Sequence, residues 1–404
     1  MAPKSLYFLS ASILVLIIAY YLAFISSVDY NKEYPSDSFP VLIFRMVSYK
    51  LLTAAGRRAL PTPLRVLDDM FGYFKIQVLF VTLDLNIPNI LHAGPQNLTT
   101  LTTLTGVRSQ EDLSRWLRAA ESFGYYVFDS KTQLWRNTEL SNLLRSGHPN
   151  TNENILRLFR QDYFGAFDSA PVALKTGEIA FELIHDGQPY FTFLKENPNH
   201  DKVFNAALSD YSRMNAPLRE DYDWGKHCKR IIDIGGGNGQ FLVDILSYYP
   251  QLSGIVLDQQ HVVDSAVVRR RQSHPELASK LSFHAGSIFD METYPNFEEN
   301  DCITMKHILH DWSDESSAKI LQNINRKIKD LNSKLIVIER VLKEHNDEFW
   351  NYAMDLIMQV ALEGKERTQP EWVSLFSDAG FTLDKVVLTR TPFAVIVATS
   401  KNSI

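Results

Sequence analysis

Residues 231–241 read IIDIGGGNGQF, an apolar run that passes into a glycine-rich turn and then into the start of an apolar helix. Glycine lets a ligand lie against bare backbone, because no side chain intervenes. The first turn of a helix offers unpaired N–H groups to a polar ligand. The stretch therefore predicts a strand, a turn and a helix that hold a nucleotide-type cofactor, and a purely structural tight turn is the alternative.

The spacing of the glycines narrows the class of cofactor. A dinucleotide fingerprint would need glycine where Gln240 stands, and the Lys-Ser/Thr pair of a phosphate-gripping loop is absent. Asp258 ends the next apolar run, GIVLD, at a position where a carboxylate suits the two hydroxyls of a ribose. The order of strand, turn, helix, strand and acid favours a cofactor site over a structural turn.

From residue 230 onward the sequence alternates between strand and helix patterns. This alternation predicts an α/β fold with a Rossmann-like, mostly parallel, doubly wound sheet and helices on both faces. Ligands of such sheets bind at the carboxyl ends of the strands, so Gly235, Asp258, Ser287 and the segment Lys306–His310 are expected at one rim. The predicted strands are Arg230–Ile234, Gly254–Leu257, Leu281–Ala285, Cys302–Lys306, Leu335–Glu339, Leu383–Leu388 and Phe393–Ala398.

The segment MKHILHDWSDE at 305–315 follows the fourth of these strands and carries the chemistry. A histidine with a pKa near neutrality suits abstraction of a proton from a phenol or a similar hydroxyl. A lone histidine is more often a surface or core residue. The place of His310 at a strand end, beside acids and an indole, favours a catalytic base.

The N-terminus is a separate region. Leu6 to Val28 contains no charged residue across 23 positions, and as a helix it would reach about 35 Å, enough to cross a bilayer core of about 30 Å. This predicts an uncleaved transmembrane anchor, with a signal peptide or a buried helix as alternatives. A polar linker to residue 38 follows, and the apolar, basic stretch 39–60 suits either a membrane-surface helix or an ordinary packed helix.

Composition limits the partners and the compartment. The net charge of −6 provides no basic field for a nucleic acid, so the helix, helix, hairpin and helix pattern of residues 98–146 predicts a winged helix that does not bind DNA. Only Cys228 and Cys302 occur, which predicts no disulfide framework and fits a reducing compartment. We therefore expect a membrane-anchored protein with a cytosolic catalytic domain, although the flanking charges leave the orientation almost undecided.

The combined motifs resemble the class I S-adenosylmethionine-dependent O-methyltransferases of the caffeate, flavonoid and acetylserotonin type, over roughly residues 65–400. The elements that carry the resemblance, in the family's order, are IIDIGGGNGQF, LDQQHVV, GSIFD, MKHILHDWSDE, LIVIERVL and LEGKERTQPEW. It implies S-adenosyl-L-methionine as cofactor, a small aromatic acceptor and a homodimer. The resemblance implies a winged-helix dimerisation domain at 64–150, a helical connector at 151–220 and a cofactor-binding domain at 221–404. The uncharged N-terminal run adds a transmembrane anchor at 1–28, followed by a linker and membrane-proximal helix at 29–63.

Site residues follow from the resemblance position by position. His310 matches the catalytic base, and Glu339 and Glu366 match the carboxylates that orient it. Phe204, Leu208 and Met358 match positions that line the acceptor pocket. The implied cofactor residues are Gly235, Gly236, Gly237, Asp258, Ser287, Ile288 and Lys306.

One cofactor position departs from the family's pattern, and other activities stay open. The family often has an acid where this chain has Ser287, so the adenine end would be held without charge.

No metal is expected, because no cluster rich in histidine or cysteine occurs, although carboxylates alone could bind magnesium. The alternative functions are methylation of a carboxylate or a nitrogen, and a non-catalytic homologue that acts as a scaffold at a membrane.

Overall fold

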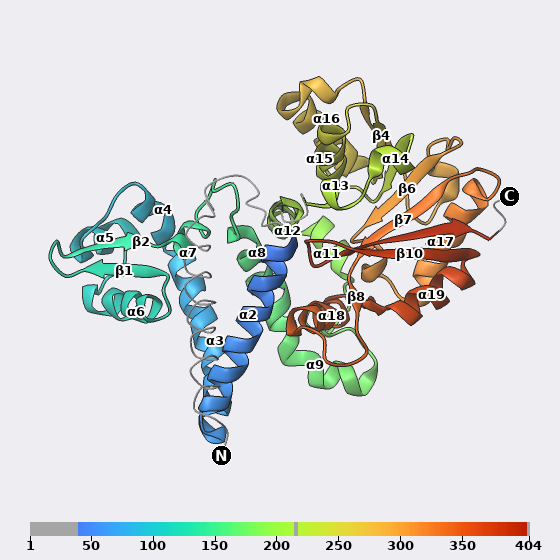
Figure 1. The fold of residues 1–404 in the computed structure, drawn as a ribbon. Helices are drawn as coiled ribbons and strands as arrows, with labels where there is room; N and C mark the ends of the chain where they lie inside the picture. The colour runs from blue at the N-terminus through green and yellow to red at the C-terminus, as the bar shows by residue number, and fades with distance from the viewer. Residues whose placement is uncertain (1–38, 214–216, 402–404) are drawn as a thin grey trace, which may run out of the picture. The chain divides into compact units, whose positions relative to one another are not determined.

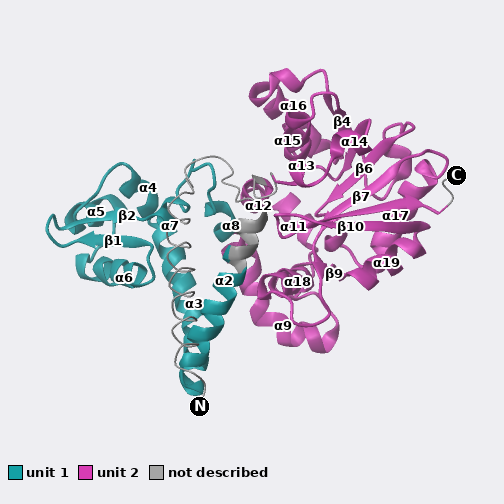
Figure 2. Ribbon diagram, in the orientation of Figure 1, with its two compact units in different colours: residues 1–157 teal, residues 158–404 magenta. Residues whose placement is uncertain are grey.

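The computed structural model describes residues 39–213 and 217–401. The chain forms two compact units, residues 1–157 and 158–404 (Figure 2). The predicted anchor at 1–28 and the predicted linker up to residue 38 lie outside the described residues. Within the part that is described, no helix combines the length and the apolar character needed to cross a membrane.

The first unit is mainly helical. Pro61 separates its two long helices, and the Ser109 side chain accepts a hydrogen bond of 3.0 Å from the Asp112 N–H at the start of α6. The predicted hairpin is also present, as the antiparallel pair β1 and β2. The elements are α2 (Phe39–Ala59), α3 (Thr62–Asp84), α4 (Ile87–His92), α5 (Leu98–Thr105), α6 (Gln110–Ser122), β1 (Tyr126–Asp129), β2 (Leu134–Asn137), α7 (Glu139–Asn142) and α8 (Glu153–Leu158).

The second unit begins with a helical segment that contains many aromatic residues. Its first element is a short π-helix, which continues directly into α9. These helices precede the sheet in the chain and supply aromatic side chains to the candidate site described below. They are η1 (Phe159–Tyr163), α9 (Phe164–Thr176), α10 (Ala180–Ile184), α11 (Tyr190–Glu196), α12 (Pro198–Arg213), α13 (Leu218–Asp221) and α14 (Trp224–His227).

A seven-stranded sheet follows, in the order β10-β11-β7-β6-β3-β4-β5. Figure 1 labels β4, β6, β7 and β10 among its strands. The strands β3 to β7 are parallel, whereas β11 runs antiparallel to β7 and β10 antiparallel to β11. All seven predicted strands are confirmed, with ends that differ by at most two residues. They are β3 (Arg230–Ile234), β4 (Ser253–Asp258), β5 (Leu281–Ala285), β6 (Asp301–Lys306), β7 (Lys334–Glu339), β10 (Phe381–Leu388) and β11 (Ala394–Ser400).

Helices cover both faces of this sheet, which explains why its central strands read as continuous apolar runs. Alternate residues of β3 face opposite ways: Ile232 packs with the helices α17 and α19, and Ile231 packs with α15. The order of the strands reverses at β3, whose neighbours are β4 and β6, so the carboxyl ends of these strands form the rim where such folds bind ligands. The remaining elements are α15 (Gln240–Tyr248), α16 (Gln260–Ser273), η2 (Pro275–Leu277), η3 (Met291–Thr293), η4 (Leu309–Asp311), α17 (Asp314–Ile328), β8 (Val341–Leu342), α18 (Phe349–Ala361), β9 (Arg367–Thr368) and α19 (Gln369–Asp378).

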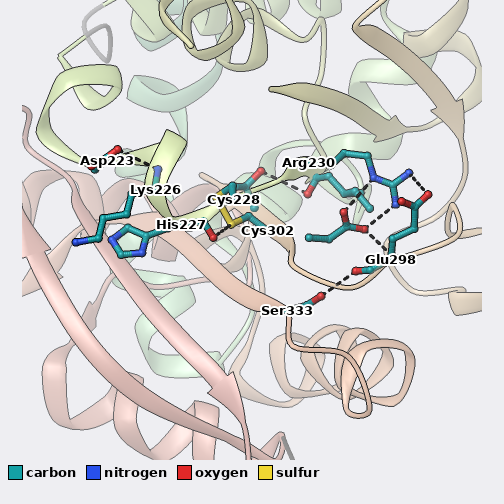
Figure 3. The surroundings of a disulfide bond; sticks show 11 residues. Asp223, Lys226, His227, Cys228, Arg230, Glu298, Cys302 and Ser333 are labelled. Carbon is teal, nitrogen blue, oxygen red and sulfur yellow. Dashed lines mark hydrogen bonds and ion pairs between the residues drawn. A yellow bond between two sulfur atoms is a disulfide. The ribbon is translucent and has the colours of Figure 1, made fainter. Parts of the chain in front are cut away.

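A disulfide joins Cys228 and Cys302, so the prediction that the two cysteines stay unpaired is wrong (Figure 3). Cys228 lies just before β3, and Cys302 lies near the start of β6, the parallel neighbour of β3. Pairing of these strands brings together residues 74 positions apart, with Cα atoms 5.4 Å from each other. Spacing along the sequence does not reveal such a contact. The reducing compartment was inferred from unpaired cysteines and loses that support.

Removal of this disulfide is expected to lower the free energy of unfolding by about 2–4 kcal/mol, because the bond closes a long loop in the unfolded chain. The double substitution Cys228→Ala and Cys302→Ala tests this in urea unfolding without reductant. Wild-type protein unfolded with a strong reductant should match the variant. Equal stability of the wild-type protein with and without reductant would contradict the expectation.

Candidate active site

The glycine turn lies between β3 and α15. Gly235 and Gly237 have φ angles of +73° and +57°, in the left-handed region that favours glycine. A side chain at Gly235 would overlap Ile308, whereas a Cβ atom at Gly237 would meet no atom within 4 Å. The backbone at Gly237 is therefore open to a ligand, as the sequence predicts for a cofactor turn.

Asp258 ends β4 and contacts this turn directly. One carboxylate oxygen, Oδ2, accepts a hydrogen bond of 2.8 Å from the Gly237 N–H, and Oδ1 accepts one of 2.7 Å from the Gln259 N–H. Burial raises the pKa of Asp258 above its usual value, although these two hydrogen bonds oppose the rise. Asp258, which is predicted to bind the ribose hydroxyls, thus lies directly beside the predicted cofactor turn.

Arg270 and Ser209, which the sequence analysis did not single out, contact the glycine turn through Asn238. Arg270 of α16 donates hydrogen bonds of 2.7 Å to the Asn238 carbonyl and 2.9 Å to the Asn238 side-chain oxygen. The Asn238 amide in turn donates to the Ser209 hydroxyl of α12, at 3.1 Å. Arg270 stands in a run of three arginines, and nothing in that run indicates which of them turns inward.

Opposite charges lie at the strand ends below the turn. Burial raises the pKa of Asp233 to about 6, and the Thr304 hydroxyl donates to its carboxylate at 2.7 Å. Burial lowers the pKa of Lys306 at the end of β6, and the neighbouring carboxylate of Asp233 partly offsets this. Lys306 is therefore placed on the predicted rim.

Ser287 and Ile288 lie in the loop after β5, one strand further along the rim. The Ser287 side chain is exposed, and its N–H donates to the Thr293 hydroxyl at 2.9 Å. Ile288 is partly buried against the core. Both residues are thus near the end of the strand that neighbours β4.

His310 lies in η4, directly beyond β6, and carboxylates surround its ring. Its Nδ1 is 3.0 Å from Glu366 Oε1 and 3.5 Å from Glu339 Oε2, and its Nε2 is 3.4 Å from Asp311 Oδ1. Glu339 is itself fixed, because its Oε1 accepts hydrogen bonds of 2.9 and 3.1 Å from the N–H groups of Ile308 and Leu309. The structure thus brings together the three residues predicted to be catalytic.

The charges of this cluster determine the protonation of the histidine. Burial would lower the pKa of His310, but Glu339, Glu366 and Asp311 outweigh burial and raise that pKa to about 10. Burial also raises the pKa of Glu339 to about 7 and that of Asp311 to about 6. The cluster therefore stabilises an imidazolium, the form that a histidine base reaches after it accepts a proton.

His307 stands beside the cluster, and burial lowers its pKa well below the usual value. Ligand atoms of His307, His310 and Glu339 lie within 4.8 Å of one another, a spacing at which they could hold a metal ion. These are groups of the base cluster itself, so a metal there would compete with the proton chemistry of His310. The expectation of no metal stays a prediction.

The residues predicted for the acceptor pocket have different surroundings. Phe204 of α12 belongs to a chain of aromatic contacts: its ring centroid is 6.3 Å from that of Phe191, which is 6.1 Å from that of Trp312, two residues after His310. Met358 is buried in α18. Leu208 is 45% exposed and lies outside the buried clusters.

Arg340 was not predicted, although it contacts the catalytic cluster. It follows Glu339 in the chain, is buried, and places its Nε 3.7 Å from Glu366 Oε1. Its place in the motif LIVIERVL, directly after the glutamate, is the signal in the sequence that points to it.

A doubly wound sheet whose rim carries a glycine turn, an aspartate at the next strand end and a buried histidine-carboxylate cluster is the arrangement that the resemblance to small-molecule methyltransferases implies. The comparison with known families agrees, because the family described as an O-methyltransferase domain matches residues 169–382. The chain belongs to this family of S-adenosylmethionine-dependent O-methyltransferases, which act on small molecules.

Individual relatives cover most of the chain. It is 31% identical over 341 residues to the phenazine O-methyltransferase PhzM of Lysobacter antibioticus, covering 84% of this chain and 97% of that protein. It is also 31% identical to the strychnine O-methyltransferase of Strychnos nux-vomica, with 79% and 91% covered. The crystal structure of LaPhzM superimposes with a TM-score of 0.77 at 31% identity, covering 84% of this chain and 100% of that one.

Proposed function

We propose that the enzyme transfers the methyl group of S-adenosyl-L-methionine to a phenolic hydroxyl of a small aromatic molecule, with His310 as general base. The observation that carries this proposal is the imidazole of His310, buried between Glu339 and Glu366 at the rim that also holds the cofactor turn. Such an arrangement suits proton removal from a weakly acidic hydroxyl.

The cofactor, when bound, supplies a methyl group activated by the positive charge on its sulfur. The residues fit it: the open backbone at Gly237 lies beside the Asp258 carboxylate, which suits the ribose hydroxyls. Ser287 and Ile288 would contact the adenine, and Gly235, Gly236 and Lys306 would complete the site.

The proton of the acceptor would go to Nε2 of His310, because Nδ1 faces the two glutamates. Glu366 and Glu339 orient the ring and stabilise its charged form, as the acid does in a serine-protease triad. Transfer of a methyl group needs the acceptor oxygen in line with the carbon–sulfur bond, so positioning of the acceptor supplies much of the rate. The aromatic contacts of Phe204, Phe191 and Trp312, together with Met358 and Leu208, suit a flat acceptor.

The test is incubation with labelled methyl donor and a panel of phenols, carboxylic acids and amines, followed by mass spectrometry of the products. Phenols should be methylated. Nitrogen methylation is the second candidate, because the chain is also 29% identical to an 8-amino-8-demethylriboflavin N,N-dimethyltransferase of Streptomyces davaonensis. Products from amines or carboxylic acids alone would overturn the phenol assignment, and a failure to bind the donor would favour a scaffold.

We also propose that residues 64–150 form a winged-helix dimerisation domain and that the N-terminal segment attaches the enzyme to a membrane. Large apolar side chains are exposed along α2 and α3, which suits a covering partner. They are Val47, Tyr49, Leu51 and Leu52 on α2, and Leu64, Val66, Leu67, Met70, Phe71, Tyr73 and Phe74 on α3.

Membrane attachment and dimerisation separate in one experiment. The full-length protein is expected in the membrane fraction, and a shortened chain that starts at Pro61 is expected in the supernatant as a dimer by light scattering. Recovery of both proteins in the supernatant would contradict the anchor. A monomeric shortened chain would contradict dimerisation through residues 64–150.

A further inference from the structure

Arg340 is a buried cation that contacts the catalytic cluster through Glu366 and two helices through hydrogen bonds. Its side chain is only 4% exposed, although a guanidinium group remains charged in proteins. Besides its approach to Glu366, it donates hydrogen bonds of 2.7 Å to the Tyr211 hydroxyl and 2.8 Å to the Asn351 side-chain oxygen. Its Cζ lies 4.8 Å from the centroid of the Phe393 ring.

A single oxygen of Glu366 faces both cations. Glu366 Oε1 is 3.0 Å from His310 Nδ1 and 3.7 Å from Arg340 Nε. The other oxygen, Oε2, is buried and has no hydrogen-bond partner among the residues that the structure describes. Arg340 Nε has no hydrogen-bond partner in the described part of the chain either, so the arginine acts on this carboxylate through the attraction of an ion pair and not through a hydrogen bond.

The hydrogen bonds of Arg340 also connect the base cluster with two helices that supply predicted acceptor residues. Tyr211 is on α12, which carries Phe204, and Asn351 is on α18, which carries Met358. Planar guanidinium groups hold such contacts in a fixed relative geometry. A displacement of either helix would thus act on Glu366 through Arg340.

The charge of Arg340 is also close to the base, because Glu366 Oε1 lies 3.7 Å from Arg340 Nε and 3.0 Å from His310 Nδ1. Three carboxylates raise the pKa of His310, yet the histidine must lose its proton before it can accept another. A permanent positive charge next to Glu366 opposes protonation of His310 and so moves its pKa down, toward the working range of a base. Loss of that charge would leave the histidine protonated to a higher pH.

We propose that Arg340 is a positioning residue of the methyl-transfer site: it holds Glu366 against His310, limits the basicity of His310, and connects both to the helices of the acceptor pocket. This inference rests on the proposed role of His310 as the base. A purely structural role for Arg340 would lower activity equally at every pH.

The test compares pH profiles of kcat/KM for the full-length enzyme and Arg340→Met. The ascending limb of the variant should move to higher pH by about one unit, because a charge within a few ångströms has been removed. The matched control is Arg230→Met, which breaks the pair of Arg230 with Asp301. Arg230 lies near the disulfide (Figure 3). The ascending limb of this control should stay where it is in the wild-type enzyme.

An unmoved limb in Arg340→Met, with activity lowered equally at all pH values, would overturn the inference while leaving the base in place. If Arg340→Met does not fold, Arg340→Lys replaces it. In that variant the ascending limb should stay within about 0.3 pH unit of the wild-type position, because the positive charge remains. Its kcat should fall about tenfold, because a lysine lacks the planar guanidinium group. A wild-type kcat would overturn the positioning role. Turnover retained in His310→Ala would disprove the role of His310 as the base. This result differs from the two outcomes that would overturn the inference about Arg340.

Discussion

Replacement of His310 by alanine is expected to lower kcat about 1,000-fold and to leave the dissociation constant of S-adenosyl-L-methionine within about threefold. The imidazole faces Glu366 at 3.0 Å and Glu339 at 3.5 Å, whereas the predicted ribose and turn contacts come from other strands. Proton removal and cofactor binding therefore depend on different residues. Single-turnover kinetics and calorimetric titration with the cofactor measure the two quantities separately.

His307→Ala is the matched control for this prediction. His307 is close to the same glutamate, but its Nδ1 is 3.9 Å from Glu339 Oε2, beyond a hydrogen bond. We expect His307→Ala to lower kcat less than about tenfold. The variant disturbs the surroundings of His310 but leaves the proposed base in place. Two results would refute the assignment of His310 as the base. One is a kcat close to that of the wild-type enzyme in His310→Ala, and the other is a larger loss of kcat in His307→Ala than in His310→Ala.

The pH dependence of the same reaction has a definite sign. A protonated His310 cannot accept the acceptor's proton, so kcat/KM should rise with pH toward the pKa of His310, which its carboxylates raise to about 10. Glu366→Gln removes one of the charges that raise this pKa, so its ascending limb should move to lower pH. A limb at the same pH in this variant would show that another group titrates.

The sequence predicted the sheet because its physical signal is local. The central strands are buried on both faces and appear as uninterrupted apolar runs, and all seven segments from Arg230–Ile234 onward could be located without knowledge of their neighbours, although the edge strand β10 is partly exposed. The rim residues followed from the rule that ligands bind at the carboxyl ends of parallel strands. The pairing of Glu339 and Glu366 with His310 came from the family resemblance, since no local pattern indicates it.

Contacts between residues far apart in the sequence could not be predicted from such local patterns. Cys228 and Cys302 meet only because β3 and β6 pair, and Arg340 meets Tyr211 across 129 residues. Charged residues such as Arg270 and Arg340 have the sequence pattern of solvent-exposed side chains, but each is buried with partners from distant segments. Composition therefore predicted the wrong state for the cysteines and no role for these arginines.

Replacement of Asp258 by asparagine is expected to weaken binding of S-adenosyl-L-methionine about 100-fold. The carboxylate accepts hydrogen bonds from the N–H groups of both Gly237 and Gln259. An amide can accept only one of these bonds and turns an N–H donor toward the other. The variant therefore loses charge-assisted hydrogen bonds to the ribose and also loosens the glycine turn, and each such bond contributes about 1.5–3 kcal/mol.

Calorimetric titration gives the dissociation constant, and the cofactor-induced rise in melting temperature should shrink in parallel, because a ligand stabilises a protein according to its affinity. Asp264→Asn is the control. Asp264 is exposed on α16 and accepts a hydrogen bond from the neighbouring Gln260 side chain, so this variant should bind as the wild-type enzyme does. Since His310 is untouched in Asp258→Asn, saturating cofactor should restore most of kcat. A dissociation constant within threefold of wild type would show that the turn binds the cofactor without this carboxylate.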